Sequence, residues 1–341
     1  MKKTRKILIY YFGHIGDTLV TYPAIRMIRK NYPDAELFLM NHYTTKNPLH
    51  AELFAGKELF SEIYLFAPPN GFLEKIRFYC SFFSVFLKHR FDRIFVFSFH
   101  RNYSKTIALS SLLFQFKKQK LVPFSETSGR SIYQEYIRVL QGDGLVFSED
   151  IFDFPLTEAE KSTAERTALE ITQGQAIPMI AFGVGGKQSV CLWNLENYIQ
   201  LIKLLKTKIN FIPVYIGSPS DRKSVEKLIS DCGGIFLPDT DCKTLREVIA
   251  FYKRCLCYIG NDSGSAHLAG IAGLKSAILY PAHDLPQEKW YPVGNGHLFI
   301  RKDVPCAGCG KGTCPKEPPS CLEMITPTEV FEKVVPWLGK I

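Results

Sequence analysis

The sequence has no apolar run that could cross a lipid bilayer. Its longest apolar tract, residues 76–87, contains Arg77 and is far shorter than the roughly 20 residues of a spanning helix. The basic residues 2–6 resemble the start of a signal peptide, but the apolar run behind them is short and no small-residue cleavage site follows. Both absences predict a cytoplasmic protein.

Acidic residues are scarce in one part of the chain. The whole sequence has 42 Lys and Arg against 33 Asp and Glu, a net charge of +9. Ten of the cations lie between residues 71 and 120, where the only acids are Glu74 and Asp92. Nearly the whole excess is therefore local, and it favours an anionic partner such as phosphates, acidic sugars or lipid headgroups.

The same stretch is rich in aromatic residues, 13 of which are interleaved with the cations from Phe72 to Lys120. One interpretation is a surface that rests on anionic lipid, at the inner face of the cell membrane, or that holds an acidic glycan. The other is a buried aromatic core edged by solvated lysines. No nucleic-acid-binding module is recognisable, so we expect no nucleic-acid partner.

Cysteine is plentiful, with ten residues, but a chain of 341 residues does not need disulfides to fold. We therefore expect mostly reduced thiols. Four of them fall within 16 residues rich in Gly and Pro, at a spacing that fits a structural zinc or iron ion; free or paired thiols are the alternative. The other six are predicted to be small core hydrophobes. The candidate metal ligands are Cys306, Cys309, Cys314 and Cys321.

Strand and helix patterns alternate along the chain, as in α/β proteins with parallel sheets. In a second series, Thr157 and Glu160 form a capping box that opens a polar helix ending near Gly174. The strands predicted from apolar runs are 6–12, 35–40, 93–98, 120–123, 178–182, 210–216, 255–259 and 275–280, and the clearest helices are 18–31, 194–206, 245–252 and 265–272. These patterns predict domains at 1–156 and 178–325, a linker helix and connection at 157–177, and a C-terminal helix at 326–341.

Two glycine loops follow predicted strands, and neither matches a nucleotide-binding fingerprint. The glycines of loop 13–17 are not in dinucleotide spacing, and loop 183–188 has Gln188 where a phosphate loop needs Ser or Thr. Lys187 is nevertheless a cation on a flexible loop after a strand, which hints at phosphate contact. Asp17 lies at a helix start, where it is either a cap or a group that faces a ligand.

The segment 260–267 is more informative. A strand delivers Asp262, Ser263, Gly264 and Ser265 to the first turn of a helix of small residues. The N–H groups of that turn, two hydroxyls and the positive end of the helix dipole suit a pyrophosphate, and His267 adds a donor. The alternative is a well-capped core helix with His267 as a buried structural residue.

These motifs together resemble glycosyltransferase family 9, the ADP-heptose:lipopolysaccharide heptosyltransferases, along most of the chain. The combination of Gly16-Asp17 with Asp262-Ser263-Gly264 and His267-Leu268 is fairly specific, whereas either part alone is weak. Further matching segments are Pro23, Tyr32-Pro33-Asp34-Ala35, Phe91-Asp92, Asn261, Ser265-Ala266, Ala269 and Trp290-Tyr291-Pro292.

The resemblance implies a GT-B fold, with two Rossmann-like domains of parallel sheets facing a central cleft. It implies inverting transfer of a heptose from ADP-heptose to an acidic, lipid-linked lipopolysaccharide core, without a catalytic metal. The first domain then serves the acceptor and the second the nucleotide-sugar donor, and four-cysteine tails occur in parts of the family.

The resemblance also assigns roles to residues. Asp17 matches the family's general base, Asp221 falls where relatives place an acid near the donor ribose, and His100 and Arg101 fall in the acceptor region. Where many relatives have Lys-Arg-Trp-Pro, this chain has Cys191-Leu192-Trp193-Asn194, which leaves Lys187 as the cation for the donor phosphate. The remaining donor-binding residues are Gly16, Asp262, Ser263, Gly264, Ser265 and His267.

Three other functions fit parts of the pattern. A different sugar-nucleotide enzyme, such as an epimerase, has the same architecture but needs no acceptor. A nicotinamide dehydrogenase also has two α/β domains, although both fingerprints fail. A non-catalytic scaffold built around the cysteine segment would bind no nucleotide.

Overall fold

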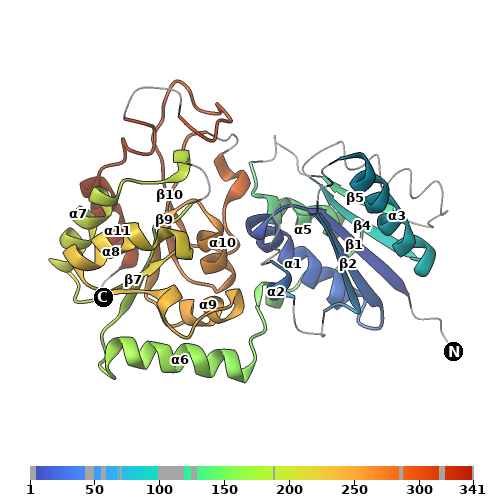
Figure 1. The fold of residues 1–341 in the computed structure, drawn as a ribbon, viewed down its shortest axis with the longest axis horizontal. Coiled ribbons are helices and arrows are strands. Elements are labelled where there is room, and N and C mark those ends of the chain that lie inside the picture. The colour runs from blue at the N-terminus through green and yellow to red at the C-terminus, as the bar shows by residue number, and fades with distance from the viewer. Residues whose placement is uncertain are drawn as a thin grey trace. The chain divides into compact units, whose positions relative to one another are not determined.

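The computed structural model describes residues 5–42, 50–54, 59–67, 69, 71–98, 119–123, 129–186, 189–283, 287–314 and 319–339. The chain divides into two compact units, Met1–Phe152 and Asp153–Ile341, called here the first and the second unit (Figure 1). The division lies just before the predicted domain end at residue 156. The helix predicted as a linker belongs to the second unit.

The first unit is built on a five-stranded parallel sheet with the strand order β3-β2-β1-β4-β5. Helix α1 begins at Ile15 rather than at Thr18, because His14 is already its N-cap. The elements are β1 (Lys6–Phe12), α1 (Ile15–Asn31), β2 (Glu36–His42), α2 (His50–Leu53), β3 (Glu62–Phe66), α3 (Phe72–Lys88), β4 (Arg93–Ser98), β5 (Gln119–Pro123), α5 (Ile132–Gly142) and the 3-10 helix η1 (Glu149–Phe152).

Both faces of this sheet are covered, which is why its strands are continuous apolar runs rather than alternating ones. On one face, Leu8 and Tyr10 of β1 pack in a core with Phe82 and Phe86 of α3. On the other face lie α1 and α5, where the ring of Tyr136 contacts that of Phe97 at a centroid distance of 4.8 Å.

The second unit has a six-stranded parallel sheet with the order β11-β10-β9-β6-β7-β8. Its elements are α6 (Glu158–Thr172), β6 (Met179–Gly183), η2 (Ser189–Cys191), α7 (Leu195–Lys206), β7 (Ile212–Ile216), η3 (Pro219–Asp221), α8 (Arg222–Cys232), β8 (Ile235–Phe236), η4 (Leu237–Asp239), α9 (Leu245–Tyr252), β9 (Cys257–Asn261), α10 (Gly264–Ile271), β10 (Ser276–Leu279), η5 (Gln287–Trp290), β11 (Leu298–Ile300) and α11 (Pro327–Leu338).

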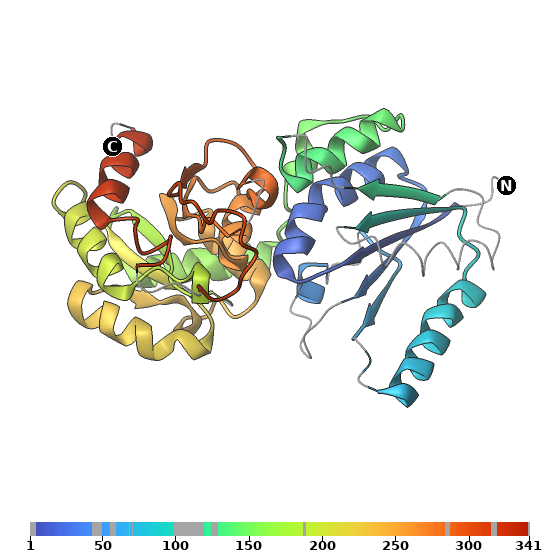
Figure 2. The same ribbon diagram turned by 90° about the horizontal axis from the view of Figure 1, so that it is seen from above.

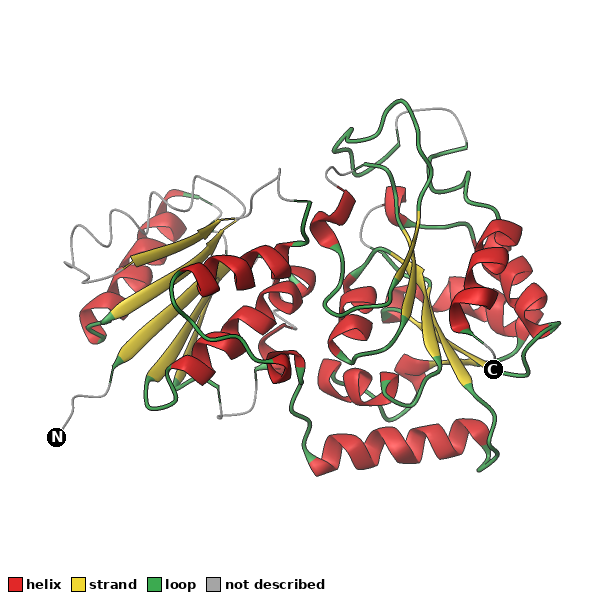
Figure 3. Cartoon of the chain, turned by 180° about the vertical axis from the view of Figure 1, so that it is seen from behind, coloured by secondary structure: helices red, strands yellow, loops and turns green. Residues whose placement is uncertain are grey.

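Helices again cover both faces of the sheet (Figure 3). Helices α7, α8 and α11 pack on one face in a single core, and α6, α9 and α10 lie on the other. The predicted capping box opens α6, since Thr157 accepts from the Glu160 N–H and Glu160 accepts from the Thr157 N–H. Glu160 also accepts a 2.6 Å hydrogen bond from Nε of Arg246 on α9, which ties α6 to the second unit.

Within the described ranges, no helix combines the length and the apolar character that crossing a membrane requires.

Candidate active site

The strand orders identify one switch point in each sheet. In the first unit, the chain builds outward from β1 to β3 and then continues on the other side with β4 and β5, so the switch lies between β1 and β4. In the second unit it lies between β6 and β9 by the same reasoning. Open parallel sheets bind ligands beyond the carboxyl ends of the strands at such points. Residues 13–17 and residues 183–186 with 261–265 are therefore the candidate sites.

Asp17 lies in the first turn of α1, directly after the turn that ends β1. Its Oδ2 accepts a 2.7 Å hydrogen bond from the His14 N–H, so the carboxylate caps the helix. Gly13 has a φ of 140°, and a Cβ at this position would collide with the Asp17 carboxyl group. Only glycine thus lets the chain turn back over this side chain, which remains half-exposed.

Two buried tyrosines lie near Asp17. Burial raises the pKa of Tyr11 and of Tyr136, and the negative charge of Asp17 raises both further. Both phenols are therefore protonated at neutral pH. The buried side chains on this side of Asp17 form a surrounding of low dielectric constant, in which charges interact more strongly than in water.

In the second unit, Gly183 and Gly260 pair directly across β6 and β9. A Cβ on Gly183 would collide with the hydroxyl of Tyr258, and a Cβ on Gly260 would lie 2.6 Å from the carbonyl oxygen of Gly183. The two glycines therefore make room for the buried Tyr258 side chain at the switch point. Burial raises the pKa of Tyr258 to about 12, so its hydroxyl keeps its hydrogen at neutral pH.

A cluster of hydroxyls leads from Tyr258 to the start of α10. The Tyr258 hydroxyl lies 2.9 Å from the Ser265 Oγ, which lies 2.8 Å from the Ser263 Oγ. Ser263 is the N-cap residue of α10 and half-exposed. Because the first N–H groups of a helix have no intrahelical partner, this hydroxyl-lined helix start can bind an anion.

Asn261 organises the loops around this helix start, a role that the sequence motif did not indicate. Its buried Oδ1 accepts from the Trp193 N–H at 3.0 Å and from the Tyr198 hydroxyl at 3.1 Å. Its Nδ2 donates to the carbonyl oxygen of Val184 at 3.3 Å. One side chain thus holds β9, the glycine loop after β6 and the segment before α7 together.

Asp221 lies beside the same glycine loop. Its Oδ2 accepts from the Ser218 N–H at 2.7 Å and from the Ser218 hydroxyl at 2.8 Å. A Cβ on Gly185 would be 2.6 Å from this oxygen, so the loops after β6 and β7 meet at the Asp221 carboxylate. The structure thereby brings Asp221 to the glycine loop after β6.

His267, on α10, is 5% exposed. Burial lowers its pKa to about 4, and the neighbouring His297 contributes in the same direction. The ring is therefore neutral at pH 7 and cannot supply a positive charge to an anion. Its Nδ1 makes no hydrogen bond within the described part of the chain.

Three predicted site residues, Lys187, His100 and Arg101, lie outside the described residues. The structure places Gly16 beside Asp17 in the first turn of α1. It places Asp262, Ser263, Gly264 and Ser265 together at the junction of β9 and α10.

The cysteine-rich segment packs on the chain that follows β10. The Gly308 N–H donates to the Ala282 carbonyl oxygen at 2.8 Å, and the Ala282 N–H donates to the Cys321 sulfur at 3.3 Å. Across the described ranges, no three His, Cys, Asp or Glu side chains form a group that could hold a metal ion. The four predicted ligands, all described, are therefore not gathered into one site.

None of the ten cysteines, all of them in described segments, forms a disulfide. Of the six predicted core cysteines, Cys191, Cys232, Cys242 and Cys257 are buried and Cys255 is half-buried. The prediction is wrong for Cys80, which lies on an exposed face of α3.

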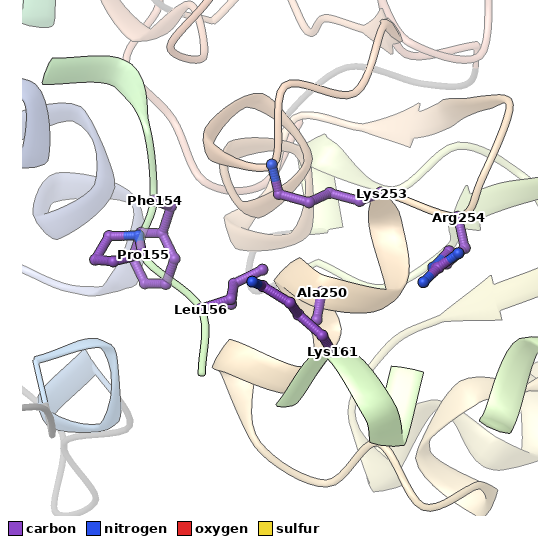
Figure 4. A pocket seen from close by; sticks show the side chains of 7 residues that line it. All are labelled: Phe154, Pro155, Leu156, Lys161, Ala250, Lys253 and Arg254. Atoms are coloured by element: carbon purple, nitrogen blue, oxygen red, sulfur yellow. The ribbon is translucent and has the colours of Figure 1, made fainter. Parts of the chain in front are cut away.

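Among the described residues of the second unit, two of the cavities have the following linings. The larger, about 480 Å³, is lined by Phe154, Pro155, Leu156, Lys161, Ala250, Lys253 and Arg254 (Figure 4). Lys253 and Arg254 precede β9, so this cavity lies toward the amino ends of the strands, away from the switch point. The smaller, about 280 Å³, includes Tyr280 and Arg301, which follow β10 and β11 at the carboxyl edge.

Comparison with known proteins gives a family match. The model of glycosyltransferase family 9 (heptosyltransferase) matches residues 134–319, more than half of the chain. Lipooligosaccharide heptosyltransferase 2 of Campylobacter jejuni is 30% identical over 95 residues, which make up 28% of this chain and 29% of that protein. The chain thus matches less than a third of the length of this relative.

Solved structures resemble the chain over nearly its whole length. A family 9 glycosyltransferase from Veillonella parvula has a TM-score of 0.74 at 17% identity and covers 99% of this chain and 98% of its own. The ADP-heptose lipopolysaccharide heptosyltransferase II of E. coli has a TM-score of 0.69 at 18% identity and covers 98% of each chain. The iron-containing dodecameric glycosyltransferase TibC of E. coli has a TM-score of 0.51 at 13% identity and covers 98% of this chain and 77% of its own.

These likenesses confirm the predicted fold class, GT-B with two Rossmann-like α/β domains. The residues that the family model matches include the segment from Asp221 to His267. The chain belongs to glycosyltransferase family 9, the heptosyltransferase family.

Proposed function

We propose that the protein is an inverting glycosyltransferase that moves a heptose from ADP-heptose to an acidic, lipid-linked lipopolysaccharide core sugar. The observation that carries this proposal is the hydroxyl-lined start of α10 at the switch point of the second sheet, in a chain of this family. The names of the relatives support the donor and the acceptor class, because they refer to ADP-heptose and to lipooligosaccharide or lipopolysaccharide.

The second unit would bind the donor. The N–H groups at the start of α10, with the hydroxyls of Ser263 and Ser265, would hold the pyrophosphate and stabilise the charge that the departing ADP gains. Asp221 would accept from the ribose hydroxyls, and His267 would act as a neutral hydrogen-bond partner. Lys187 is the proposed cation for the phosphates.

Asp17 of the first unit is the proposed general base. It would take the proton of the acceptor hydroxyl as that oxygen attacks the anomeric carbon. The bond between the anomeric carbon and the phosphate oxygen breaks in the same step, and ADP leaves. Because a carboxylate supplies this activation, the proposed reaction needs no catalytic metal. His100 and Arg101 are proposed to face the acidic acceptor, and the cytoplasmic face of the membrane is the proposed place of work.

We expect ADP to raise the melting temperature more than UDP or GDP does. A ligand that binds only the native state at about 100 times its Kd stabilises it by about 2.7 kcal/mol. The variants Ser263→Ala and His267→Ala should reduce this shift, whereas Ser84→Ala on α3 should not. Thermal unfolding with each nucleotide measures the effect. If none of the three nucleotides changes the melting temperature, the donor site is wrongly assigned.

Dependence on an acceptor separates transfer from epimerisation. The proposed enzyme should release ADP from ADP-heptose at a substantial rate only when a lipid-linked core acceptor is present. Chromatography of the nucleotide products measures this directly. Conversion of the nucleotide sugar at full rate without any acceptor would identify an epimerase instead.

We also propose that Cys306, Cys309, Cys314 and Cys321 bind one structural zinc or iron ion. Four thiolates suit either metal. The four side chains do not lie together in the structure, so metal binding would have to rearrange the segment. Elemental analysis should find about one metal per chain, lost in Cys309→Ser and kept in the exposed control Cys80→Ser. Protein purified without chelator that has no metal and four titratable thiols here would contradict the proposal.

A further inference from the structure

Helix α3 is apolar over more of its surface than the first unit buries. Phe82, Val85 and Phe86 are buried and pack on β1, β2 and β4. A second set of large apolar side chains on the helix is exposed to solvent, most of it in the N-terminal half. The apolar outer face consists of Phe72, which is 78% exposed, Leu73 (71%), Ile76 (46%), Tyr79 (45%) and Leu87 (74%).

The spacing of these residues groups most of them on one surface. Positions 72, 76 and 79 are each about one turn of an α-helix apart, so their side chains lie side by side on the N-terminal half, and Leu87 lies two turns further on, beyond the half-buried Phe83. Single exposed apolar residues are ordinary, but gathered ones mark an interaction site. Of the nine large apolar residues recorded as exposed in the described ranges, five are on this helix.

The N-terminal half of α3 has few packing partners. From Phe72 to Ser81 every residue except Phe78 is exposed, whereas the C-terminal half is anchored by its buried aromatic rings. Figure 2 shows α3 beside the sheet, with its N-terminal end leading away from the strands. The helix is therefore held firmly at one end and presents apolar side chains along its free flank.

Cations border the apolar outer face. Lys75 and Arg77 are exposed on the same helix turns, and Arg90 is exposed just after the helix. Glu74 is the single acid of α3, and Lys88 is balanced by Glu62 at 2.8 Å. An apolar helix face with Lys and Arg at its rim is the pattern of helices that lie in the interface of an anionic membrane.

We propose that the apolar outer face of α3 docks the first unit on an anionic lipid bilayer. Phe72, Leu73 and Ile76 enter the interface, and Lys75 and Arg77 contact the lipid phosphates. A second copy of the chain is the alternative occupant, and the vesicle experiment below separates it from lipid. The proposed function supplies only the reason for this docking, because a lipid-linked acceptor would lie at a membrane surface.

Vesicle binding by the full chain tests this. Sedimentation with vesicles of phosphatidylcholine mixed equally with phosphatidylglycerol should show binding that is stronger than to pure phosphatidylcholine and falls with salt, because charge attraction is screened within about 8–10 Å at physiological salt. The double variant Phe72→Ser with Ile76→Ser should bind these vesicles with an affinity at least about tenfold lower than that of the wild type. Val146→Ser, 72% exposed elsewhere in the first unit, is the matched control and should bind normally.

Charge reversal supplies an independent arm. Lys75→Glu with Arg77→Glu should abolish the preference for phosphatidylglycerol, whereas Lys253→Glu with Arg254→Glu should keep it. Both double variants should retain the ADP-induced thermal shift, so a loss of lipid binding is separable from a failure of the donor site.

Three results would overturn the docking proposal. The first is that the wild type binds neutral and anionic vesicles equally, or binds neither. The second is that the Phe72→Ser, Ile76→Ser variant binds anionic vesicles as the wild type does. The third is that the full chain binds no vesicles but forms a dimer, which this variant disrupts. The last result would assign the face to a second copy.

Discussion

Replacing Asp17 with asparagine should lower turnover by about 10²–10⁴-fold, the usual contribution of a positioned base. Asparagine keeps the shape of the side chain, and its oxygen can still accept from the His14 N–H, a bond that Asp17 makes at 2.7 Å. The variant should therefore fold and bind ADP as the wild type does. Steady-state kinetics with the lipid-linked acceptor should show the loss in kcat, with little change in donor affinity.

A matched control separates catalysis from capping. Glu247 occupies the same N3 position in α9, where it accepts from the Thr244 N–H at 2.8 Å, and its helix follows the edge strand β8 rather than a strand at the switch point. Glu247→Gln should leave turnover unchanged. Near-normal turnover of Asp17→Asn would remove Asp17 from the mechanism, and unfolding of the variant would show that capping is its main role.

Replacing Gly260 with alanine should destabilise the second unit and remove ADP binding. The new Cβ would lie 2.6 Å from the carbonyl oxygen of Gly183 and 2.8 Å from its Cα, and these backbone atoms cannot rotate away as a side chain can. Overpacking of this kind costs about 1–3 kcal/mol or more. It would also separate β6 from β9 at the point where the glycine loop and α10 meet.

Urea unfolding and ADP-induced stabilisation measure the two effects of Gly260→Ala. Gly142→Ala at the end of α5 is the control, because no atom lies within 4 Å of its added Cβ. It should be neutral or slightly stabilising, by about 0.5–1 kcal/mol at most. A Gly260→Ala protein with wild-type stability and a normal ADP shift would show that the close approach of the two strands is not needed.

The sequence predicted the parts of the fold that have strong local signals. The apolar runs at Lys6–Phe12 and Arg93–Ser98 are strands with the predicted bounds, and the capping box at Thr157 opens a helix as expected. The predicted bounds of the two strands at the second switch point end before Gly183 and Asn261, whereas the observed strands include both residues. Glycine and asparagine are weak strand formers, so the apolar pattern stops short of them. Their strand geometry comes from the pairing of β6 with β9, which is not local.

The same distinction explains the site. The residues at the start of α10 could be found from their order in the sequence, because a strand, a turn and a helix place them together. The roles of Tyr258 and Asn261 could not, since each depends on neighbours supplied by β6 or by the segment before α7. The strand β3 and the helix α5 were missed as well, the former because it is short and only half-buried.

The hydroxyl cluster at the start of α10 has fewer hydrogens than hydrogen-bonding contacts. The hydroxyls of Tyr258, Ser263 and Ser265 share four contacts: the two already described and, at 3.3 Å each, those of Tyr258 and Ser263 with the carbonyl oxygen of Asn261. Three hydroxyls carry three hydrogens, so at least one of the four contacts lacks a hydrogen. An anion at the helix start would compete with these contacts for a hydroxyl hydrogen, so its binding would redistribute hydrogens within the cluster.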